Sequence, residues 1–266
     1  MTGHVQVTGP GYTASPGVGS GNGQATGLEA GLRGIDLDAF CREAAVWQFA
    51  GGRARVAGCD VCINLRALAA RLGQAELLAA GNAARVGEAL AQGLLKSFMR
   101  PPDTMRYRHF VHVPAALLAL PETWALLDQL PAVSRSMLVL TVTMRLARLA
   151  ELAAVVGRLT EMGVCVCLSG VDFAILPHER LPAGVGWLRG KVTTALDPLH
   201  TEAMLLALAP AQAIAEPADD ESALRFALEV GFQHAVGPAA EAAARHPPTI
   251  PARAAARRTE YHSFAP

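Results

Sequence analysis

The chain lacks an excess of charge of either sign. Its 23 Lys and Arg residues balance 23 Asp and Glu residues, so no net field attracts it to nucleic acid or to an acidic lipid surface. It also lacks any run of 18 uninterrupted apolar residues, and residues 1–4 do not begin a basic segment followed by an apolar one. These absences argue against nucleic-acid binding, a membrane span and a signal peptide, and they predict a neutral cytoplasmic protein.

Cysteine is scarce, and its number is odd. Five cysteines in 266 residues fit a reducing compartment better than a disulfide framework. Cys59 and Cys62 have CxxC spacing and Cys165 and Cys167 have CxC spacing, so four thiolates could form a tetrahedral zinc site. Residues three apart on a strand point to opposite faces, however. The pattern therefore favours small buried side chains in a core, and no metal or other cofactor is expected.

Tryptophan and histidine are scattered and show no partner spacing. We expect the histidines at 112 and 178 to be satisfied by local contacts. The three tryptophans are expected to pack in the core or at its rim rather than to form a platform for stacking bases; they are Trp47, Trp124 and Trp187.

The two ends of the chain differ in composition from the middle. Residues 1–33 are rich in Gly, Ser, Thr and Pro and cannot bury enough apolar surface to offset chain entropy, which predicts disorder. Their glycine-rich centre is not a phosphate loop, since no strand precedes it and no helix start follows closely. Residues 241–266 predict a mobile tail, in which a weak anion-binding patch of arginines is the alternative. Residues 34–240 remain as one domain.

Strand-like and helix-like segments alternate through this domain. Strands are predicted at about 55–65, 109–113, 137–142, 164–168, 187–189, 213–215 and 232–236. Helices are predicted at about 36–50, 66–99 (one or two helices), 114–130, 146–159, 199–209 and 221–230. Such alternation predicts an α/β fold with a parallel sheet, and this number of units favours a closed βα barrel of the TIM type. Seven strands are recognisable, so the eighth is hidden or missing.

The helix predicted at 36–50 depends on a capping residue and on apolar spacing. Asp36 or Asp38 can cap its first turn, and Phe40, Ala44 and Trp47 share one helical face.

The order of these units, and several residues on them, resemble the EAL family, whose members are barrel-shaped phosphodiesterases that hydrolyse cyclic di-GMP. In that family a strand with Glu-x-Leu is followed by strands bearing an Asn, a Glu and an Asp pair. The corresponding positions here are Asp60, His112, Thr141, and Ser169 with Gly170. Most of the family's acidic ligands on these strands are therefore replaced.

The later family motifs are Lys-x-Asp, Ala-Glu-Gly-x-Glu and a closing Gln-Gly turn. Arg189 corresponds to the Lys and Lys191 to the Asp, so a base stands where the family has an acid. Glu216 is retained, and Asp219 stands in place of the second Glu. Val236 with Gly237 replaces the closing turn. The resemblance covers about residues 50–240 and is most specific over 137–237.

These replacements bear on the reaction that the resemblance implies. Two Mg²⁺ or Mn²⁺ ions need several hard oxygen ligands. Thr141, Ser169 and Gly170 cannot supply that charge, and Lys191 in the cluster would repel a divalent cation. We therefore expect a degenerate, catalytically inactive EAL-like barrel that serves as a noncatalytic signalling or protein-interaction module in bacterial cyclic di-GMP-related regulation.

Two alternatives stay open. The barrel could bind cyclic di-GMP as a sensor without hydrolysing it. In the less favoured alternative, it is a divergent metal-dependent phosphodiesterase whose site is rebuilt from Asp60, His112, Asp172 and Glu216.

Four residues are the candidates for ligand binding: Asp60, His112, Arg189 and Glu216. A carboxylate at a strand end beside a cation commonly pairs with it. We therefore expect Glu216 to pair with Arg189 or Lys191 rather than to bind a metal.

An apolar stretch follows the predicted strand at 164–168, in a loop region where polar residues are usual. Its residues are Val171, Phe173, Ile175 and Leu176. We predict that they form a contact surface for a protein partner or for self-association. The alternative is that they fold back as a helix over the barrel rim.

Overall fold

The computed structural model describes residues 37–73, 83–99, 107–143, 149–174, 181–208, 211–217 and 220–248. The disorder predicted for residues 1–33 and the tail beyond residue 248 lie outside these ranges. Helix α9 (Pro238–Arg245) crosses the predicted boundary between domain and tail. The first five residues of the predicted tail are therefore helical.

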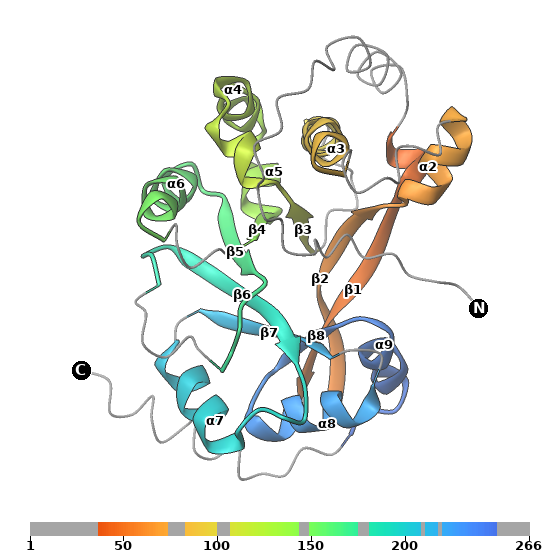
Figure 1. Cartoon of the computed structure of the whole chain (residues 1–266), viewed down its shortest axis with the longest axis vertical. Helices are drawn as coiled ribbons and strands as arrows, with labels where there is room; N and C mark the ends of the chain where they lie inside the picture. Colours follow the sequence, from red (N-terminus) through yellow and green to blue (C-terminus); the bar gives the residue numbers. More distant parts are fainter. Residues whose placement is uncertain are drawn as a thin grey trace, which may run out of the picture. The chain divides into compact units, whose positions relative to one another are not determined.

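Eight strands form a closed barrel in which each strand is bonded to its neighbours in sequence order (Figure 1). The α/β barrel of the TIM type predicted from the sequence is confirmed. Strand β1 runs antiparallel to both of its neighbours, and all other neighbouring pairs are parallel. The strands are β1 (Cys41–Ala50), β2 (Arg53–Ile63), β3 (Arg108–His112), β4 (Leu138–Thr143), β5 (Cys165–Ser169), β6 (Val185–Val192), β7 (Gln212–Pro217) and β8 (His234–Val236).

The strand that the sequence left hidden is the first one. The helix expected over 36–50 is wrong, because this segment forms the 3₁₀ helix η1 (Leu37–Phe40) followed by strand β1. Strand β1 pairs with β2 along its whole length and closes the barrel by pairing with β8. Gly51 and Gly52, with φ angles of 57° and 70°, form the hairpin turn. Two consecutive positive φ angles suit a type I′ turn, whose twist matches that of the two strands.

Helices connect most of the parallel strands, and all of them except α5 lie in or close to the segments predicted for them. The range 66–99 divides into two helices, and the range 114–130 into a 3₁₀ turn and a helix. Their bounds are α2 (Leu65–Leu72), α3 (Ala83–Ser97), η3 (Ala115–Ala119), α4 (Pro121–Gln129), α5 (Ala132–Met137), α6 (Leu149–Glu161), α7 (Pro198–Ala207) and α8 (Glu221–Val230). Side chains cap the first turns of α2, α7 and α8 through Asn64, Asp197 and Asp220. Within the described ranges, no helix is both long and apolar enough to cross a bilayer.

Two apolar clusters fill the two sides of the sheet. The larger one joins the outer face of the strands to the helices, and the smaller one lies in the barrel interior; its buried members are Val46, Phe110, Val139, Cys167, Trp187, Ile214 and Val236. Alternate residues on a strand face the same side. The residues two places after Phe110, Trp187 and Ile214 therefore also face the interior, at the carboxyl ends of their strands. These residues are His112, Arg189 and Glu216.

Candidate functional site

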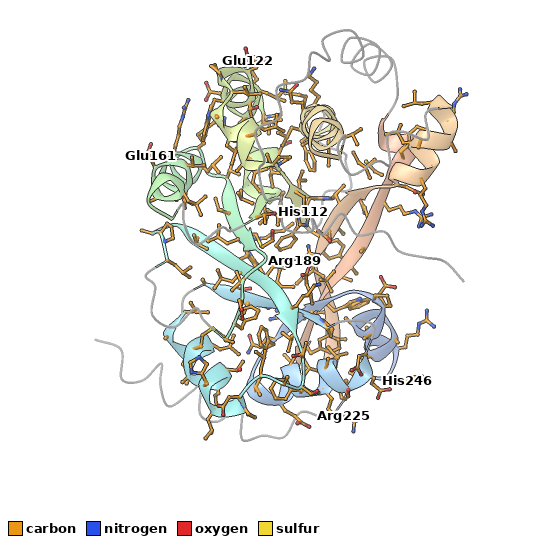
Figure 2. All side chains as sticks on the ribbon, in the orientation of Figure 1. His112, Glu122, Glu161, Arg189, Arg225 and His246 are labelled. Carbon is orange, nitrogen blue, oxygen red and sulfur yellow. The ribbon has the colours of Figure 1, made fainter. Side chains whose placement is uncertain are left out.

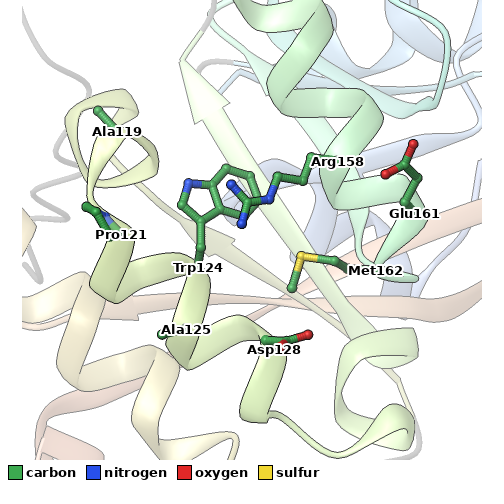
Figure 3. Close-up of a pocket in the computed structure, with 8 residues that line it drawn as sticks. All are labelled: Ala119, Pro121, Trp124, Ala125, Asp128, Arg158, Glu161 and Met162. Atoms are coloured by element: carbon green, nitrogen blue, oxygen red, sulfur yellow. The ribbon is translucent and has the colours of Figure 1, made fainter.

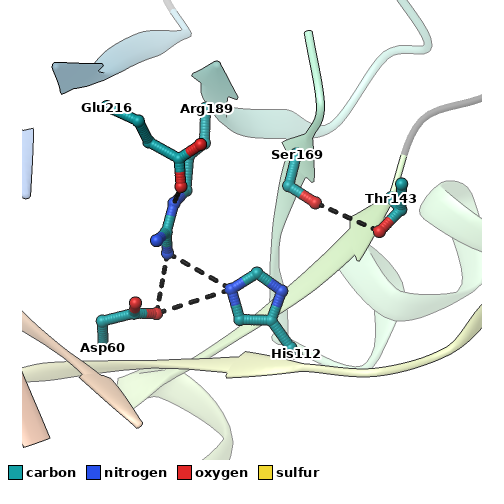
Figure 4. A network of polar contacts seen from close by, with 6 residues as sticks. All are labelled: Asp60, His112, Thr143, Ser169, Arg189 and Glu216. Carbon is teal, nitrogen blue, oxygen red and sulfur yellow. Dashed lines mark hydrogen bonds and ion pairs between the residues drawn. The ribbon is translucent and has the colours of Figure 1, made fainter. Parts of the chain in front are cut away.

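The four ligand candidates named from the sequence meet in one network at the carboxyl ends of strands β2, β3, β6 and β7 (Figure 4). Arg189 is its centre. Its Nη1 lies 2.7 Å from Oδ1 of Asp60, and its Nε donates to Oε1 of Glu216. Nε2 of His112 lies 3.2 Å from Nη1 of Arg189 and 3.6 Å from Oδ1 of Asp60. The expected pairing of Glu216 with a neighbouring cation is confirmed, with Arg189 as the partner.

The network bridges the interior of the barrel. Strands β2 and β6 lie on opposite sides of the eight-stranded ring, so the Arg189 side chain must cross the interior to reach Asp60. Arg189 and His112 accordingly lie near the centre of the structure, whereas Arg225 lies at its periphery (Figure 2). The long guanidinium side chain is suited to this span, because its fork presents donors to two carboxylates at once.

Burial makes the network strong and also costly to disturb. The side chains of Arg189 and Asp60 are 3% and 4% exposed, and that of Glu216 is 16% exposed. Burial alone would raise the pKa of Asp60, but the polar contact with His112 and the charge of Arg189 outweigh it and hold this pKa well below its ordinary value. Burial would likewise lower the pKa of Arg189, but the charges of Asp60 and Glu216 raise it well above its usual range. Asp60 and Arg189 therefore remain ionised at neutral pH.

The segment after β5 holds the main chain of Arg189 in place. The amide of Val171 donates to the carbonyl of Arg189 at 3.1 Å. A Cβ atom on Gly190 would lie 2.1 Å from the carbonyl oxygen of Val171, so only glycine permits this close approach. The ring of Phe173 meets that of Phe232 edge-on at 4.9 Å. Residues 171–173 therefore pack directly on strand β6, beside the ionic network.

This packing corrects the predicted interaction surface. The side chains of Val171 and Phe173 are 3% and 1% exposed, so they belong to the core and offer no surface to a partner. These two residues are buried because Gly190 lets their segment close onto the sheet. The folding-back alternative fits these two residues, although residues 171–174 contain a turn at 173–174 and no helix. Ile175 and Leu176 lie outside the described residues.

The donor set at this end of the barrel does not fit two divalent cations. Both carboxylates already pair with one guanidinium, whose positive charge would repel a metal ion placed between them. The remaining groups at the ends of β4 and β5 are neutral hydroxyls, and Ser169 Oγ lies 3.4 Å from Thr143 Oγ1. Within the described residues, no three His, Cys, Asp or Glu side chains are grouped as metal ligands. The Arg189 network thus occupies the space between the carboxylates that a metal would need.

Asp172 stands apart from this network. Its carboxylate accepts a hydrogen bond from the amide of Ala174 at 2.9 Å and so stabilises the local turn. A site rebuilt from all four residues proposed for a divergent enzyme is therefore not assembled in this conformation. Asp219 and His178 lie outside the described residues.

Cys59 and Cys167 are protonated thiols at neutral pH. Cys167 lies fully buried in the interior cluster, and burial raises its pKa to about 12. Burial, together with the charge of Glu43, raises the pKa of Cys59 to about 11. A thiolate is the form that binds metal or reacts. The buried-core interpretation holds for Cys167, and Cys59 and Cys165 are partly exposed.

Sequence reasoning missed the roles of Gly190 and of the paired hydroxyls of Thr143 and Ser169. The only available signal was Gly190 directly after the strand predicted at 187–189, because a glycine in a strand commonly marks a close backbone approach. The tryptophan prediction holds for Trp124 and Trp187, both of which are buried.

Comparisons with known proteins show similarity to solved structures and to no family model or curated protein. No family model matches the chain, and no curated protein matches it. Among solved structures, it is similar to the EAL enzyme Bd1971 bound to cAMP and cyclic di-GMP (12% identity, TM-score 0.50, 80% of this chain and 65% of that chain). It is also similar to YkuI of Bacillus subtilis, with an EAL domain, in complex with cyclic di-GMP and calcium (15% identity, TM-score 0.53, 86% of this chain and 61% of that chain).

A third similar structure is the EAL domain of FimX from Xanthomonas citri in complex with cyclic di-GMP (10% identity, TM-score 0.53, 84% of this chain and 94% of that chain). The chain spans less than two thirds of the length of Bd1971 and of YkuI. At these identities the likeness concerns the fold: the chain has the barrel fold of EAL domains.

Proposed function

We propose that this protein is a noncatalytic EAL-like module that acts in bacterial cyclic di-GMP-related signalling through contacts with a protein partner or a second copy of itself. One observation carries the proposal: a single buried guanidinium pairs with both carboxylates at the carboxyl end of the barrel. The cyclic di-GMP bound in Bd1971, YkuI and FimX supplies the signalling context.

The absence of catalysis in this proposal follows from charge. Metal-assisted hydrolysis of a phosphodiester needs anionic oxygens to hold the cations and to stabilise a metal-bound hydroxide. Here Asp60 and Glu216 both pair with Arg189 in a buried network, which offsets part of their negative charge. Displacing it would leave a guanidinium without partners in an apolar barrel, at a cost of several kcal/mol.

Hydrolysis assays on the full chain test this part of the proposal. The protein is incubated with cyclic di-GMP and either Mg²⁺ or Mn²⁺, and chromatography follows the loss of substrate. We expect no turnover above a sample containing a chelator. Metal-dependent turnover that disappears in Glu216→Gln would refute the proposal, because it would assign Glu216 to catalysis.

A sensor that binds cyclic di-GMP is the second candidate, and it rests on the basic side chains that remain accessible at the same end of the barrel. The side chain of His112 is 43% exposed, and Lys191 at the end of β6 is also exposed. Both could contact a phosphate group without a metal.

Titration calorimetry with cyclic di-GMP, with and without Mg²⁺, separates the candidates. Heat that is independent of Mg²⁺ favours the sensor, and heat that requires Mg²⁺ favours a divergent enzyme. Absence of binding leaves the protein-interaction module, which sedimentation analysis and capture of a partner then address.

A further inference from the structure

A groove on the outer helical layer carries a second arrangement of groups suited to a ligand. Its volume is about 610 Å³, and it lies between helix α4 and the end of helix α6 (Figure 3). This volume is within the range of about 300–1,000 Å³ that is typical of small-molecule sites. Apolar side chains and three charged ones line it, the charged ones being Asp128, Arg158 and Glu161.

A fixed planar stack forms one wall of the groove. The guanidinium of Arg158 lies over the ring of Trp124, with its Cζ 4.0 Å from the ring centroid (Figure 3). The indole Nε1 donates to the carbonyl of Leu118 at 2.8 Å and holds the ring in place. One face of the guanidinium is therefore covered by the indole, and Arg158 remains exposed. A second planar group can stack on the other face, as nucleobases do on arginine planes.

The two carboxylates define the hydrogen-bonding pattern that such a group needs. Asp128 and Glu161 are exposed, and in the described part of the chain neither forms an ion pair. An ionised carboxylate only accepts hydrogen bonds, so a ligand must present N–H donors. Together with Arg158, the groove carries one net negative charge, which disfavours an anionic group in its interior.

We propose that this groove binds a guanine-type base, a neutral planar heteroaromatic ring that stacks on Arg158 and donates adjacent N–H groups to Asp128 or Glu161. A guanine edge carries two neighbouring N–H donors that match the two oxygens of a carboxylate, and such paired contacts are stronger than single ones. Adenine lacks the ring N–H donor. The site lies outside the barrel and is independent of the Arg189 network.

Binding of guanosine, which has no phosphate, tests this assignment on the full chain. NMR titration compares guanosine, 1-methylguanosine and adenosine. We expect guanosine to bind and the other two to bind at least about tenfold more weakly, since each loses a hydrogen bond to a charged group. The double variant Asp128→Asn, Glu161→Gln and the single variant Arg158→Met should each weaken guanosine binding by a similar factor. Glu122→Gln, on the same helix α4 but outside the groove lining, is the matched control and should leave it unchanged.

Three results would overturn the assignment. Absence of guanosine binding removes the base site, and equal binding of all three nucleosides removes the role of the carboxylates. Binding of N-acetylarginine amide without guanosine would identify a site for cationic peptides instead. Circular dichroism on each variant checks that a lost signal reflects lost contacts and not lost fold.

Discussion

Replacing Arg189 with Met tests whether one buried cation holds the end of the barrel together. Met fills a similar space but removes the charge, which leaves Asp60 and Glu216 as two buried carboxylates at 4% and 16% side-chain exposure. Removing one partner from a buried ion pair costs about 3–5 kcal/mol, because an uncompensated charge remains. That is a large part of the roughly 5–15 kcal/mol by which proteins are stable.

Urea unfolding followed by circular dichroism measures this loss. With a slope of about 1–3 kcal/mol per molar urea, Arg189→Met should lower the unfolding midpoint by about 1 M or more. The matched control is Arg225→Met, which removes an arginine from the exposed helical pair with Glu221, whose two side chains are 66% and 82% exposed. Exposed pairs of this kind contribute about 0.3–0.5 kcal/mol, so the control should unfold almost with the wild type.

A rescue variant separates charge from packing. The triple variant Asp60→Asn, Arg189→Met, Glu216→Gln removes all three charges and retains similar volumes. If the loss in Arg189→Met comes from unpaired carboxylates, the triple variant should recover much of the stability. A loss below about 1 kcal/mol in Arg189→Met, or no recovery in the triple variant, would refute the reasoning.

Three further predictions concern other features of the barrel. Because the folded-state pKa of Asp60 is lowered, the stability that its carboxylate contributes is present above the unfolded pKa of about 3.9 and is lost as the pH falls towards the folded value. The difference in unfolding free energy between wild type and Asp60→Asn should therefore stay constant from pH 7 to about 5 and shrink below about 4. A difference that shrinks between pH 7 and 5 would contradict this. Gly190→Ala should lower the free energy of unfolding by about 1–3 kcal/mol, because its Cβ atom would collide with the carbonyl of Val171. The control is Gly157→Ala in helix α6, where a Cβ atom would meet no other atom within 4 Å and should stabilise the helix by about 0.8–1 kcal/mol. Urea unfolding measures both effects, and equal effects would rule out the close approach. Cys167 is fully buried and its pKa is raised, so it should resist alkylation by iodoacetamide at pH 8 until urea unfolds the chain. Peptide mass spectrometry measures the extent of alkylation. Rapid labelling of the folded protein would instead show that the interior cluster opens.

The sequence predicted the repeating strands and helices well because their signals are local. Continuous apolar runs such as residues 164–168 predict strands covered on both faces, and the regular apolar spacing of α6 predicts a helix. The sequence did not identify strand β1, because the apolar residues of this segment also fit one helical face. Its conformation comes from pairing with β2 and β8, and such tertiary pairing overrides local preference. The adjacent Gly51 and Gly52 were the local sign of a hairpin.

For the candidate site too, some features were predictable from the sequence and others depended on tertiary structure. The chain alone indicated the charged residues at strand ends and the pairing of Glu216 with a nearby cation, since β6 and β7 are neighbours in the barrel and each strand's alternation follows from its own residues. Only the closed barrel brought Asp60 from the opposite side to Arg189 and buried both. Only tertiary packing placed Val171 and Phe173 in the core, because a contact across Gly190 depends on how two separate segments approach. Local composition records which groups are present, whereas burial and long-range pairing depend on chain closure, which no short stretch of sequence encodes.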